Sequence, residues 1–238
     1  MNLDKISVVI LAGGLGTRLR NFRGSNATKV LLKINGIPMI IKQIEQVISW
    51  GFNLNNIVCV TNPSIHVAIN KVTRDKFGTE IKYVIQPEPL GISHAFSFAK
   101  DIVTSDYVLL VLGDNFFEQN PFKGFSPNFD VVANIFTKNV ENPKDFGVAE
   151  VSGDRIISLE EKPKVPLSNL AVVGVYLYRQ DVFEKIKSLK PSQRGEYEIT
   201  DLNKILIDHG GISFKEINGW WIDAGTPERI MELEEKID

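Results

Sequence analysis

The sequence predicts an α/β protein with a doubly wound, mixed but mainly parallel sheet in a single domain. Short apolar runs alternate with amphipathic segments through the first half of the chain, which is typical of parallel strands connected by helices. The run at residues 8–11 is apolar throughout, as expected for a strand covered on both faces. The length of 238 residues suits one such domain.

The first half contains four strand signals with helix signals between them. Pro38 precedes an amphipathic segment and Gly51 follows it, which marks the two ends of a helix. We expect Ser64 to act as the N-cap of the next helix. The expected strands cover residues 7–11, 57–61, 81–85 and 107–112, and the expected helices cover residues 39–50, 64–77 and 91–103.

The pattern changes after Asp114, because strand signals then follow one another with little helix between them. Thr226 and Pro227 start the terminal helix, as a cap followed by proline at the first helical position. The expected strands cover residues 131–136, 147–151, 155–160, 171–178, 213–217 and 220–222, and the expected helices cover residues 181–188, 198–209 and 226–236.

Composition narrows the class of protein. The net charge of −2 gives no basic excess for nonspecific binding of nucleic acid. The only cysteine, Cys59, lies in an apolar run, so no disulfide framework is expected. No signal-peptide pattern is present, and no apolar run approaches the length of a membrane span. We therefore expect a soluble cytoplasmic protein with neither nucleic acid nor membrane as its partner.

A glycine-rich segment follows the first strand, at residues 12–16, and Arg18, Arg20 and Lys29 come after it. Glycines let backbone N–H groups approach phosphate oxygens, and the cations neutralise the charge of a polyphosphate. No Gly-Lys pair is present, which excludes the nucleotide P-loop, and Leu19 stands where the dinucleotide motif needs its third glycine. A plain tight turn is the alternative, but the three glycines with three cations favour a phosphate site.

Two aspartates, Asp114 and Asp223, each follow a predicted strand. A carboxylate at the end of a buried strand suits Mg²⁺ bound together with phosphate oxygens, although Asp223 also fits a helix cap. Ligands of such sheets lie beyond the carboxyl ends of the strands. We therefore expect a nucleotide-binding half at residues 1–115 and an acceptor half at residues 116–238.

Other polar segments stay open to two interpretations. Residues 160–163 could form a charged turn, and the acids of residues 195–198 could favour a helix N-terminus. The three histidines, His66, His94 and His209, share no metal-ligand spacing, and no nucleophile-elbow signature is present.

With these motifs in place, the chain resembles the sugar-1-phosphate nucleotidylyltransferases, and their glucose-1-phosphate thymidylyltransferase branch most of all. The resemblance extends from Val8 to about Leu233. It rests on Leu11-Ala-Gly-Gly-Leu-Gly-Thr-Arg-Leu19, Lys29, Gln86-Pro87, Gly91, Leu112-Gly-Asp-Asn-Phe116, Phe146-Gly-Val148, Ser158-Leu-Glu-Glu-Lys-Pro163, Ala171-Val-Val-Gly174, Arg194-Gly-Glu-Tyr-Glu-Ile-Thr-Asp201 and Asp223-Ala-Gly-Thr226.

The resemblance implies a Rossmann-like nucleotidyltransferase fold, with the acceptor half binding sugar phosphate, and a role for each matching residue. Three residues are implied as catalytic: Arg18 and Lys29 on the triphosphate, and Lys162 on the sugar phosphate. Asp114 and Asp223 are implied to bind Mg²⁺. Nucleotide contacts are implied for Leu11, Gly13, Gly14, Gln86, Gly91 and Asp114, and sugar-phosphate contacts for Asn115, Gly147, Glu161, Lys162, Val172 and Glu196.

The implied reaction joins dTTP and glucose 1-phosphate into dTDP-glucose and pyrophosphate. The second pKa of the sugar phosphate is about 6, so its phosphate group is already largely a dianion near neutral pH. The attacking oxygen therefore needs no general base. The enzyme then supplies position and positive charge. This agrees with the absence of a nucleophilic triad.

Four positions depart from the family pattern. His94 stands for a usual glutamine, Val30 for a glutamine, Phe146 for a tyrosine and Tyr197 for a leucine. These departures bear on base and sugar preference. The resemblance is to a short form, so we expect the C-terminal helices of the long bacterial form, and an end-product site built on them, to be missing.

Three alternatives remain. The first keeps the chemistry and uses UTP or another sugar 1-phosphate. The second is a noncatalytic regulatory or scaffold homologue that binds nucleotide sugar, which would be expected to lose charged site residues. The third, a nicotinamide dehydrogenase, lacks its third glycine. The sequence leaves a homo-oligomer open.

Overall fold

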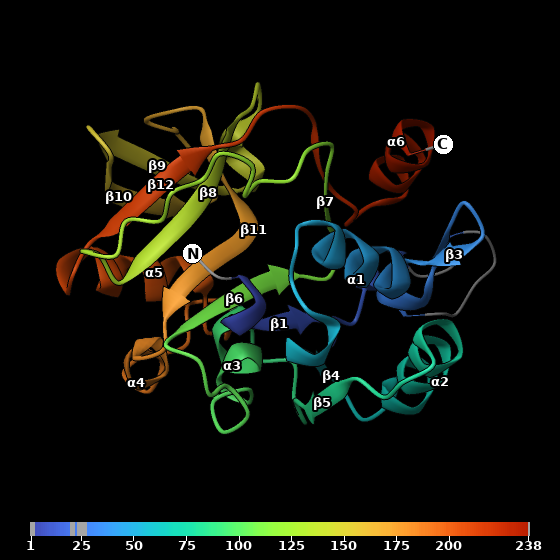
Figure 1. Cartoon of the computed structure of the whole chain (residues 1–238). Helices are drawn as coiled ribbons and strands as arrows, with labels where there is room; N and C mark the ends of the chain where they lie inside the picture. Colours follow the sequence, from blue (N-terminus) through green and yellow to red (C-terminus); the bar gives the residue numbers. More distant parts are fainter. Residues whose placement is uncertain (1–2, 20–21, 23–27, 238) are drawn as a thin grey trace.

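Parallel strands form the first part of the sheet, as predicted. The computed structural model describes residues 3–19, 22 and 28–237, so Arg20 lies outside the described residues. The strands β1 (Ser7–Leu11), β4 (Ile57–Thr61), β5 (Lys82–Ile85) and β6 (Tyr107–Leu112) stand in the order β5-β4-β1-β6, and all three pairs are parallel. The helices α1 (Met39–Ser49), α2 (His66–Phe77) and α3 (Ile92–Ser97) connect them (Figure 1).

The second half of the chain extends the same sheet, mostly with antiparallel pairs. Its strands are β8 (Ala133–Asn139), β9 (Gly147–Ser152), β10 (Arg155–Glu161), β11 (Leu170–Arg179) and β12 (Ile212–Glu216). The order continues β6-β11-β8-β12-β10-β9, and β8 with β12 is the parallel pair of this half. The sheet is therefore mixed as predicted, with its parallel pairing concentrated in the first half.

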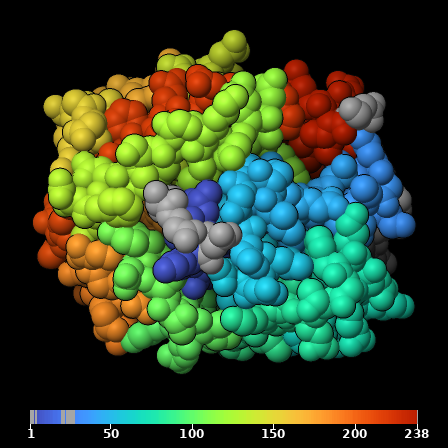
Figure 2. All heavy atoms as spheres, viewed as in Figure 1, coloured from blue at the N-terminus to red at the C-terminus, as the bar shows by residue number. Residues whose placement is uncertain are grey.

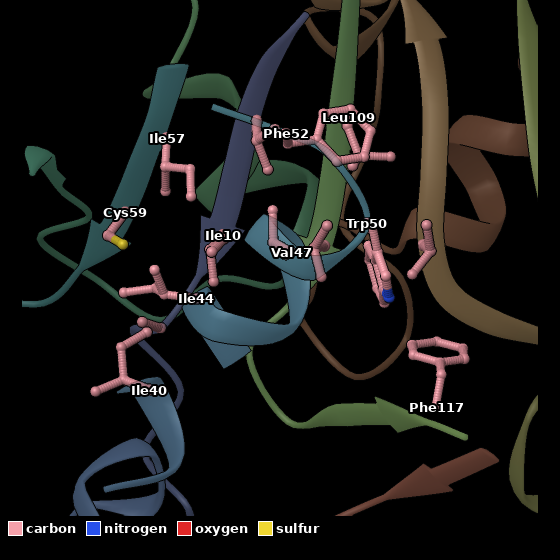
Figure 3. Close-up of a cluster of buried hydrophobic side chains, with 14 of the residues drawn as sticks. Ile10, Ile40, Ile44, Val47, Trp50, Phe52, Ile57, Cys59, Leu109 and Phe117 are labelled. Carbon is pink, nitrogen blue, oxygen red and sulfur yellow. The ribbon is translucent and has the colours of Figure 1, made fainter. Parts of the chain in front are cut away.

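Side chains from alternate positions of the central strands enter two different cores. Val8 and Ile10 of β1 pack in the core beneath α1, whereas Val9 packs in the core on the opposite face. Figure 3 shows Ile40, Ile44 and Val47 of α1 facing β1, β4 and β6. The opposite face is covered by α3, α4 (Val182–Ile186) and α5 (Ile199–Asp208). Each fully buried isoleucine stabilises the fold by roughly 1.5–3 kcal/mol.

The terminal helix α6 (Pro227–Lys236) packs against the N-terminal part of the chain. Its buried Ile230 and Leu233 share a third core with Leu19, Ile34 and Met39. In Figure 2 the red residues of this helix adjoin blue residues from the first quarter of the chain. The predicted cap is confirmed, because the Thr226 hydroxyl accepts a hydrogen bond from the Arg229 N–H at 3.4 Å.

Two short antiparallel pairings were not predicted, although a strand was expected over residues 220–222, because segments of two or three residues show no periodic pattern. The first joins β2 (Lys33–Ile34) to β3 (Ile37–Pro38). The second joins β7 (Asn115–Phe117) to β13 (Trp221–Asp223) and sets Asp223 opposite Asn115. The Ala224 N–H also donates to the Asp114 carbonyl at 2.8 Å. These contacts bring the two strand-end aspartates together.

Two local predictions were wrong. The helix expected over residues 91–103 ends at Ser97 and continues only as turns. Ser64 does not cap α2: its N–H and hydroxyl both donate to the Asn62 side chain, at 3.0 Å and 2.6 Å, and the helix begins at His66. Within the described residues, no helix is long and apolar enough to cross a membrane.

Candidate active site

Two adjoining cavities open at the carboxyl ends of β1 and β6, where the strand order reverses. The larger has a volume of about 390 Å³ and the smaller about 150 Å³, and both are bounded by Ile92 and Leu112. Asp114 lines the larger cavity and Asp223 the smaller one. The pair of aspartates therefore lies at the junction of the two cavities.

The larger cavity contains all six residues predicted to contact a nucleotide, namely Leu11, Gly13, Gly14, Gln86, Gly91 and Asp114. The chains after β1 and β6 approach closely at its floor: the Gly113 N–H donates to the Leu11 carbonyl at 3.0 Å, and a Cβ on Gly113 would lie 2.5 Å from that oxygen. The Asn62 amide donates to the Gly13 carbonyl at 2.8 Å, which holds the glycine segment in place.

Lys29 is held between the glycine segment and the aspartates. Gly16 has a φ of +59°, and a Cβ there would lie 2.7 Å from the Lys29 Cβ. The Lys29 ammonium donates to Asp114 Oδ2, and its Nζ lies 3.8 Å from Asp223 Oδ1. The Lys29 side chain is 14% exposed, so this charge is largely screened from solvent by its neighbours.

The three charges shift one another's pKa values. Burial alone would lower the pKa of Lys29, but attraction to Asp114 and Asp223 holds it above its usual value. Burial opposes ionisation of Asp114 as well, yet Lys29 and a hydrogen bond from Asn115 lower its pKa. Burial, followed by repulsion from Asp114, raises the pKa of Asp223 to about 6. For Asp223, burial and the Asp114 charge thus outweigh the attraction of the nearby cations.

The hydrogen bonding of Asp223 tests whether the two aspartates are suitable ligands for a divalent cation. Asp223 Oδ1 is buried and accepts no hydrogen bond from the described residues. An unpartnered carboxylate oxygen beside a second carboxylate is a suitable ligand for Mg²⁺. The described residues contain no group of three or more His, Cys, Asp or Glu side chains placed for a metal. The two aspartates would therefore need phosphate oxygens or water to complete the coordination.

Arg18 lies at the edge of the site. It belongs to the short helix Thr17–Leu19, is exposed, and does not line either cavity. Its charge is close enough to act on Lys29 and on Asp223. This position suits contact with the outer part of a ligand in the larger cavity.

The smaller cavity contains five of the six residues predicted to contact sugar phosphate, namely Asn115, Gly147, Glu161, Lys162 and Val172. Thr200 donates to Glu161 Oε2 at 2.6 Å, and a Cβ on Gly147 would lie 3.1 Å from that hydroxyl. Lys162 adopts a φ of +46°, and its Nζ comes no closer than 4.0 Å to Glu161. Its ammonium is therefore available to an anionic ligand.

Glu196, the sixth predicted sugar-phosphate residue, lines the larger cavity instead. The Tyr197 N–H donates to the Leu90 carbonyl at 2.8 Å, and the Ser93 N–H donates to the Tyr197 carbonyl at 3.1 Å. These bonds join the segment before α5 to the segment before α3, which places Glu196 beside Gly91. The sequence gives no sign of this long-range pairing.

Asn115 holds Asp114 in place. Its Nδ2 donates to Asp114 Oδ1 at 2.7 Å, and its Oδ1 accepts from the Gly174 N–H at 3.0 Å and from Trp221 Nε1 at 2.8 Å. The residue is 2% exposed, and little of its hydrogen-bonding capacity remains for a ligand. The aspartate therefore has a fixed orientation before any ligand binds.

Sequence reasoning missed three residues of this site: Arg194, Thr200 and Trp221. Arg194 binds Glu198 at 2.9 Å and lies 3.8 Å from both Glu161 and Glu196, one on each cavity. Arg194 and Thr200 lie within the motif of residues 194–201, in which the resemblance implies a role for Glu196 alone. That motif was the available signal.

The four departures from the family pattern fall in different places. Phe146 lines the smaller cavity, with its ring centroid 5.0 Å from that of Trp221. Val30 is buried in the core beneath α1. His94 and Tyr197 line neither cavity: they stack on each other behind Gln86, with centroids 5.8 Å apart and His94 Nδ1 2.9 Å from Gln86 Nε2.

Comparison with known proteins identifies the class of protein. The Nucleotidyl transferase family model matches residues 7–238, and the chain belongs to this family. It is a nucleotidyltransferase. A curated relative from Neisseria meningitidis, named glucose-1-phosphate thymidylyltransferase, is 37% identical over 94% of this chain and 80% of its own length. One of the same name from Mycolicibacterium smegmatis is 37% identical over 94% of this chain and 79% of its own length.

Other relatives differ in name or length. The low-salt glycan biosynthesis nucleotidyltransferase Agl11 of Haloferax volcanii is 35% identical, and the match covers 96% of this chain but 65% of that protein. A solved Bacillus anthracis structure in complex with a sucrose, described as a candidate glucose-1-phosphate thymidylyltransferase, has a TM-score of 0.83 and 35% identity over 98% of this chain and 96% of that chain. A UDP-glucose pyrophosphorylase with UDP-glucose, at 21% identity and a TM-score of 0.83, shares the fold.

Proposed function

We propose that the protein is a glucose-1-phosphate thymidylyltransferase, which makes dTDP-glucose and pyrophosphate from dTTP and glucose 1-phosphate. The observation that carries this proposal is the cluster of Lys29, Asp114 and Asp223 at the junction of two cavities. A nucleotide in one cavity and a sugar phosphate in the other would meet at that junction. The choice of dTTP and glucose 1-phosphate as the substrates rests on the name of the relatives, glucose-1-phosphate thymidylyltransferase.

The reaction transfers a nucleotidyl group in one displacement. A phosphate oxygen of glucose 1-phosphate forms a bond to the α-phosphorus of dTTP, and the bond from that phosphorus to the β-phosphate oxygen breaks. Pyrophosphate leaves with the electron pair. No proton has to be removed from the attacking dianion, so the residues of the site act through position and charge.

Each group of residues then has a role. The glycine segment and Gln86 hold the nucleotide, and Arg18 with Lys29 neutralises the triphosphate. Lys162 binds the phosphate of the sugar, while Glu161 accepts hydrogen bonds from sugar hydroxyls. Asn115 positions Asp114 for the cation.

Mg²⁺ is the proposed cofactor, held by Asp114 and Asp223. When bound, it would neutralise charge that develops on the phosphate oxygens during the transfer. Lys29 would then be free to turn from the aspartates toward the triphosphate. Because the Lys29 charge already lies between the two carboxylates, the ligand-free site is prepared for a cation.

The test is a grid of nucleoside triphosphates (dTTP, UTP, dCTP, ATP and GTP) against sugar 1-phosphates, measured by pyrophosphate release with and without Mg²⁺. We expect the highest kcat/KM for dTTP with glucose 1-phosphate. A higher value for UTP or for another sugar would keep the chemistry and change the substrates, as the glycan-related name of the Haloferax volcanii relative suggests. No pyrophosphate from any pair would favour a noncatalytic homologue, although the charged residues Arg18, Lys29, Asp114, Lys162 and Asp223 are all present.

A further inference from the structure

Gln86 is a buried amide in the wall of the larger cavity. It follows β5 directly, is 4% exposed, and its N–H donates to the Thr61 carbonyl at 2.8 Å. Its side-chain Nε2 lies 2.9 Å from His94 Nδ1 and 3.4 Å from the Gly91 carbonyl. The amide nitrogen therefore points away from the cavity, toward α3.

These contacts fix which end of the amide faces a ligand. A backbone carbonyl can only accept a hydrogen bond, so the group facing the Gly91 carbonyl is the amide nitrogen. His94 Nδ1 then accepts as well, with the ring proton on Nε2. Gln86 Oε1 lies on the other side, 3.5 Å from the position of a Cβ on Gly13. It accepts no hydrogen bond from the described residues, and it is not among their fully buried, unpartnered polar atoms.

His94 is the stronger of the two partners of the amide nitrogen. A distance of 2.9 Å is near the optimum for a hydrogen bond, whereas 3.4 Å is long. The imidazole is itself held on two sides: it stacks on Tyr197 at an interplanar angle of 22° and meets the edge of Phe98 at 89°, with centroids 5.0 Å apart. Without His94, the Gln86 amide would have only the long contact to keep its orientation.

We propose that His94 is a positioning residue for base selection, because it holds the Gln86 amide with its oxygen toward the nucleotide. An oxygen in this position accepts from the N3–H of thymine or uracil. Cytosine has a lone pair at N3, which would face the lone pairs of the same oxygen. The inference deepens the proposed function and rests on it, since a nucleotide base must occupy the larger cavity.

The experiment compares dTTP with dCTP in the wild-type protein, His94→Asn, His94→Leu and the control His66→Leu. The asparagine Oδ1 can replace Nδ1 as acceptor, so His94→Asn keeps the wild-type preference for dTTP. His94→Leu leaves the amide free to rotate and lowers the dTTP/dCTP ratio of kcat/KM by about 3–10-fold, the value of one hydrogen bond. The loss appears as a higher KM for dTTP, with kcat within about twofold of wild type. His66→Leu removes an imidazole that lies against the Thr61 hydroxyl and the Tyr83 ring instead of Gln86, and it leaves the ratio unchanged.

A double-mutant cycle separates positioning from general damage. If His94 acts through Gln86, then His94→Leu has no further effect on the ratio in a Gln86→Leu background. An additive effect there, or equal losses in His94→Asn and His94→Leu, would overturn the proposal. So would an unchanged ratio in His94→Leu. Failure of the proposed function is a different result, because the wild-type protein would then release no pyrophosphate from any substrate pair.

Discussion

The Lys29 ammonium lies against Asp114, and its Nζ is 3.8 Å from Asp223 Oδ1. The three residues come from distant parts of the chain: Lys29 from a short helix after the glycine segment, Asp114 from the end of β6, and Asp223 from the end of β13. One positive charge is thus shared by two carboxylates that carry opposite pKa shifts.

Replacement of either aspartate should abolish most of the activity. We expect Asp114→Asn and Asp223→Asn each to lower Mg²⁺-dependent pyrophosphate release by at least about 100-fold, because a neutral amide is a poor ligand for Mg²⁺ and the charge on the phosphates stays unscreened. Initial rates across a series of Mg²⁺ concentrations check this. Asp181→Asn, on the exposed surface, is the matched control. Near-normal turnover in either site variant would remove that residue from the metal site.

The same change at Asp223 should stabilise the metal-free protein. The pKa of Asp223 rises from 3.8 to about 6 in the folded state, so its stabilising contribution is present at low pH and is lost as the pH rises through about 6. At pH 7.5 the folded protein therefore holds an unfavourable charge that asparagine lacks. Because 40% of the side chain is exposed, screening reduces the gain to about 1 kcal/mol, or about 2–4 °C in Tm.

Thermal unfolding in EDTA at pH 7.5 and at pH 4.5 measures this gain, which should shrink at the lower pH. Addition of Mg²⁺ and dTTP should reverse the order of the two proteins, since only the wild type binds them well. A lower Tm for Asp223→Asn in EDTA at pH 7.5 would show that the carboxylate stabilises the fold.

Lys162 should act on the sugar phosphate alone. The nearest carboxylate oxygen to its ammonium among the described residues is Glu161 Oε1 at 4.0 Å, so Lys162→Ala removes binding energy without breaking the fold. We expect the KM for glucose 1-phosphate to rise by about 10–100-fold, as for loss of a charge-assisted hydrogen bond, with little change in the KM for dTTP. Lys164→Ala, two residues away and exposed, is the control. An effect confined to dTTP would contradict the assignment.

Gly174 should be required for the orientation of Asp114. A Cβ at this position would lie 2.6 Å from Asn115 Cγ, so Gly174→Ala displaces the amide that binds Asp114. We expect a loss of about 1–3 kcal/mol in the free energy of unfolding, together with reduced activity. Denaturant unfolding of Gly174→Ala, Asn115→Ala and the double variant measures the coupling. The two costs should be less than additive, because the second change removes the side chain with which the new methyl group clashes. If the two losses of unfolding free energy were additive, the new methyl group would clash with a residue other than Asn115.

The sequence allowed prediction of the residues of the site better than of their arrangement. Gly13 and Asp114 could be placed because each follows a strand with a strong apolar pattern, and parallel strand ends meet at one edge of a sheet. The role of Leu11 entered through the resemblance. Lys162 and Glu161 entered through the resemblance, and the structure brings both into the smaller cavity. The unpredicted part depends on short pairings without periodicity.

Asp223 and Glu196 illustrate this limit. Asp223 is brought close to Asp114 by the pairing of two three-residue strands, β7 and β13. Strands this short have no side-chain pattern from which their pairing could be predicted. Glu196 was grouped with the sugar residues, but backbone hydrogen bonds of Tyr197 carry it to the larger cavity. The His94–Gln86 contact was also beyond the sequence, which gave His94 only as a departure from a pattern.

The late position of β13 has a consequence for biosynthesis of the protein. The ribosome releases residues 7–112, with the four strands β1, β4, β5 and β6, long before it adds residues 221–223. During that interval the nascent chain can present Lys29 beside Asp114, but the second carboxylate does not yet exist. The pair of aspartates is therefore one of the last features to assemble, when β13 docks on β7 and α6 covers the core around Leu19. A growing chain can acquire most of its sheet while it is still unable to catalyse the reaction.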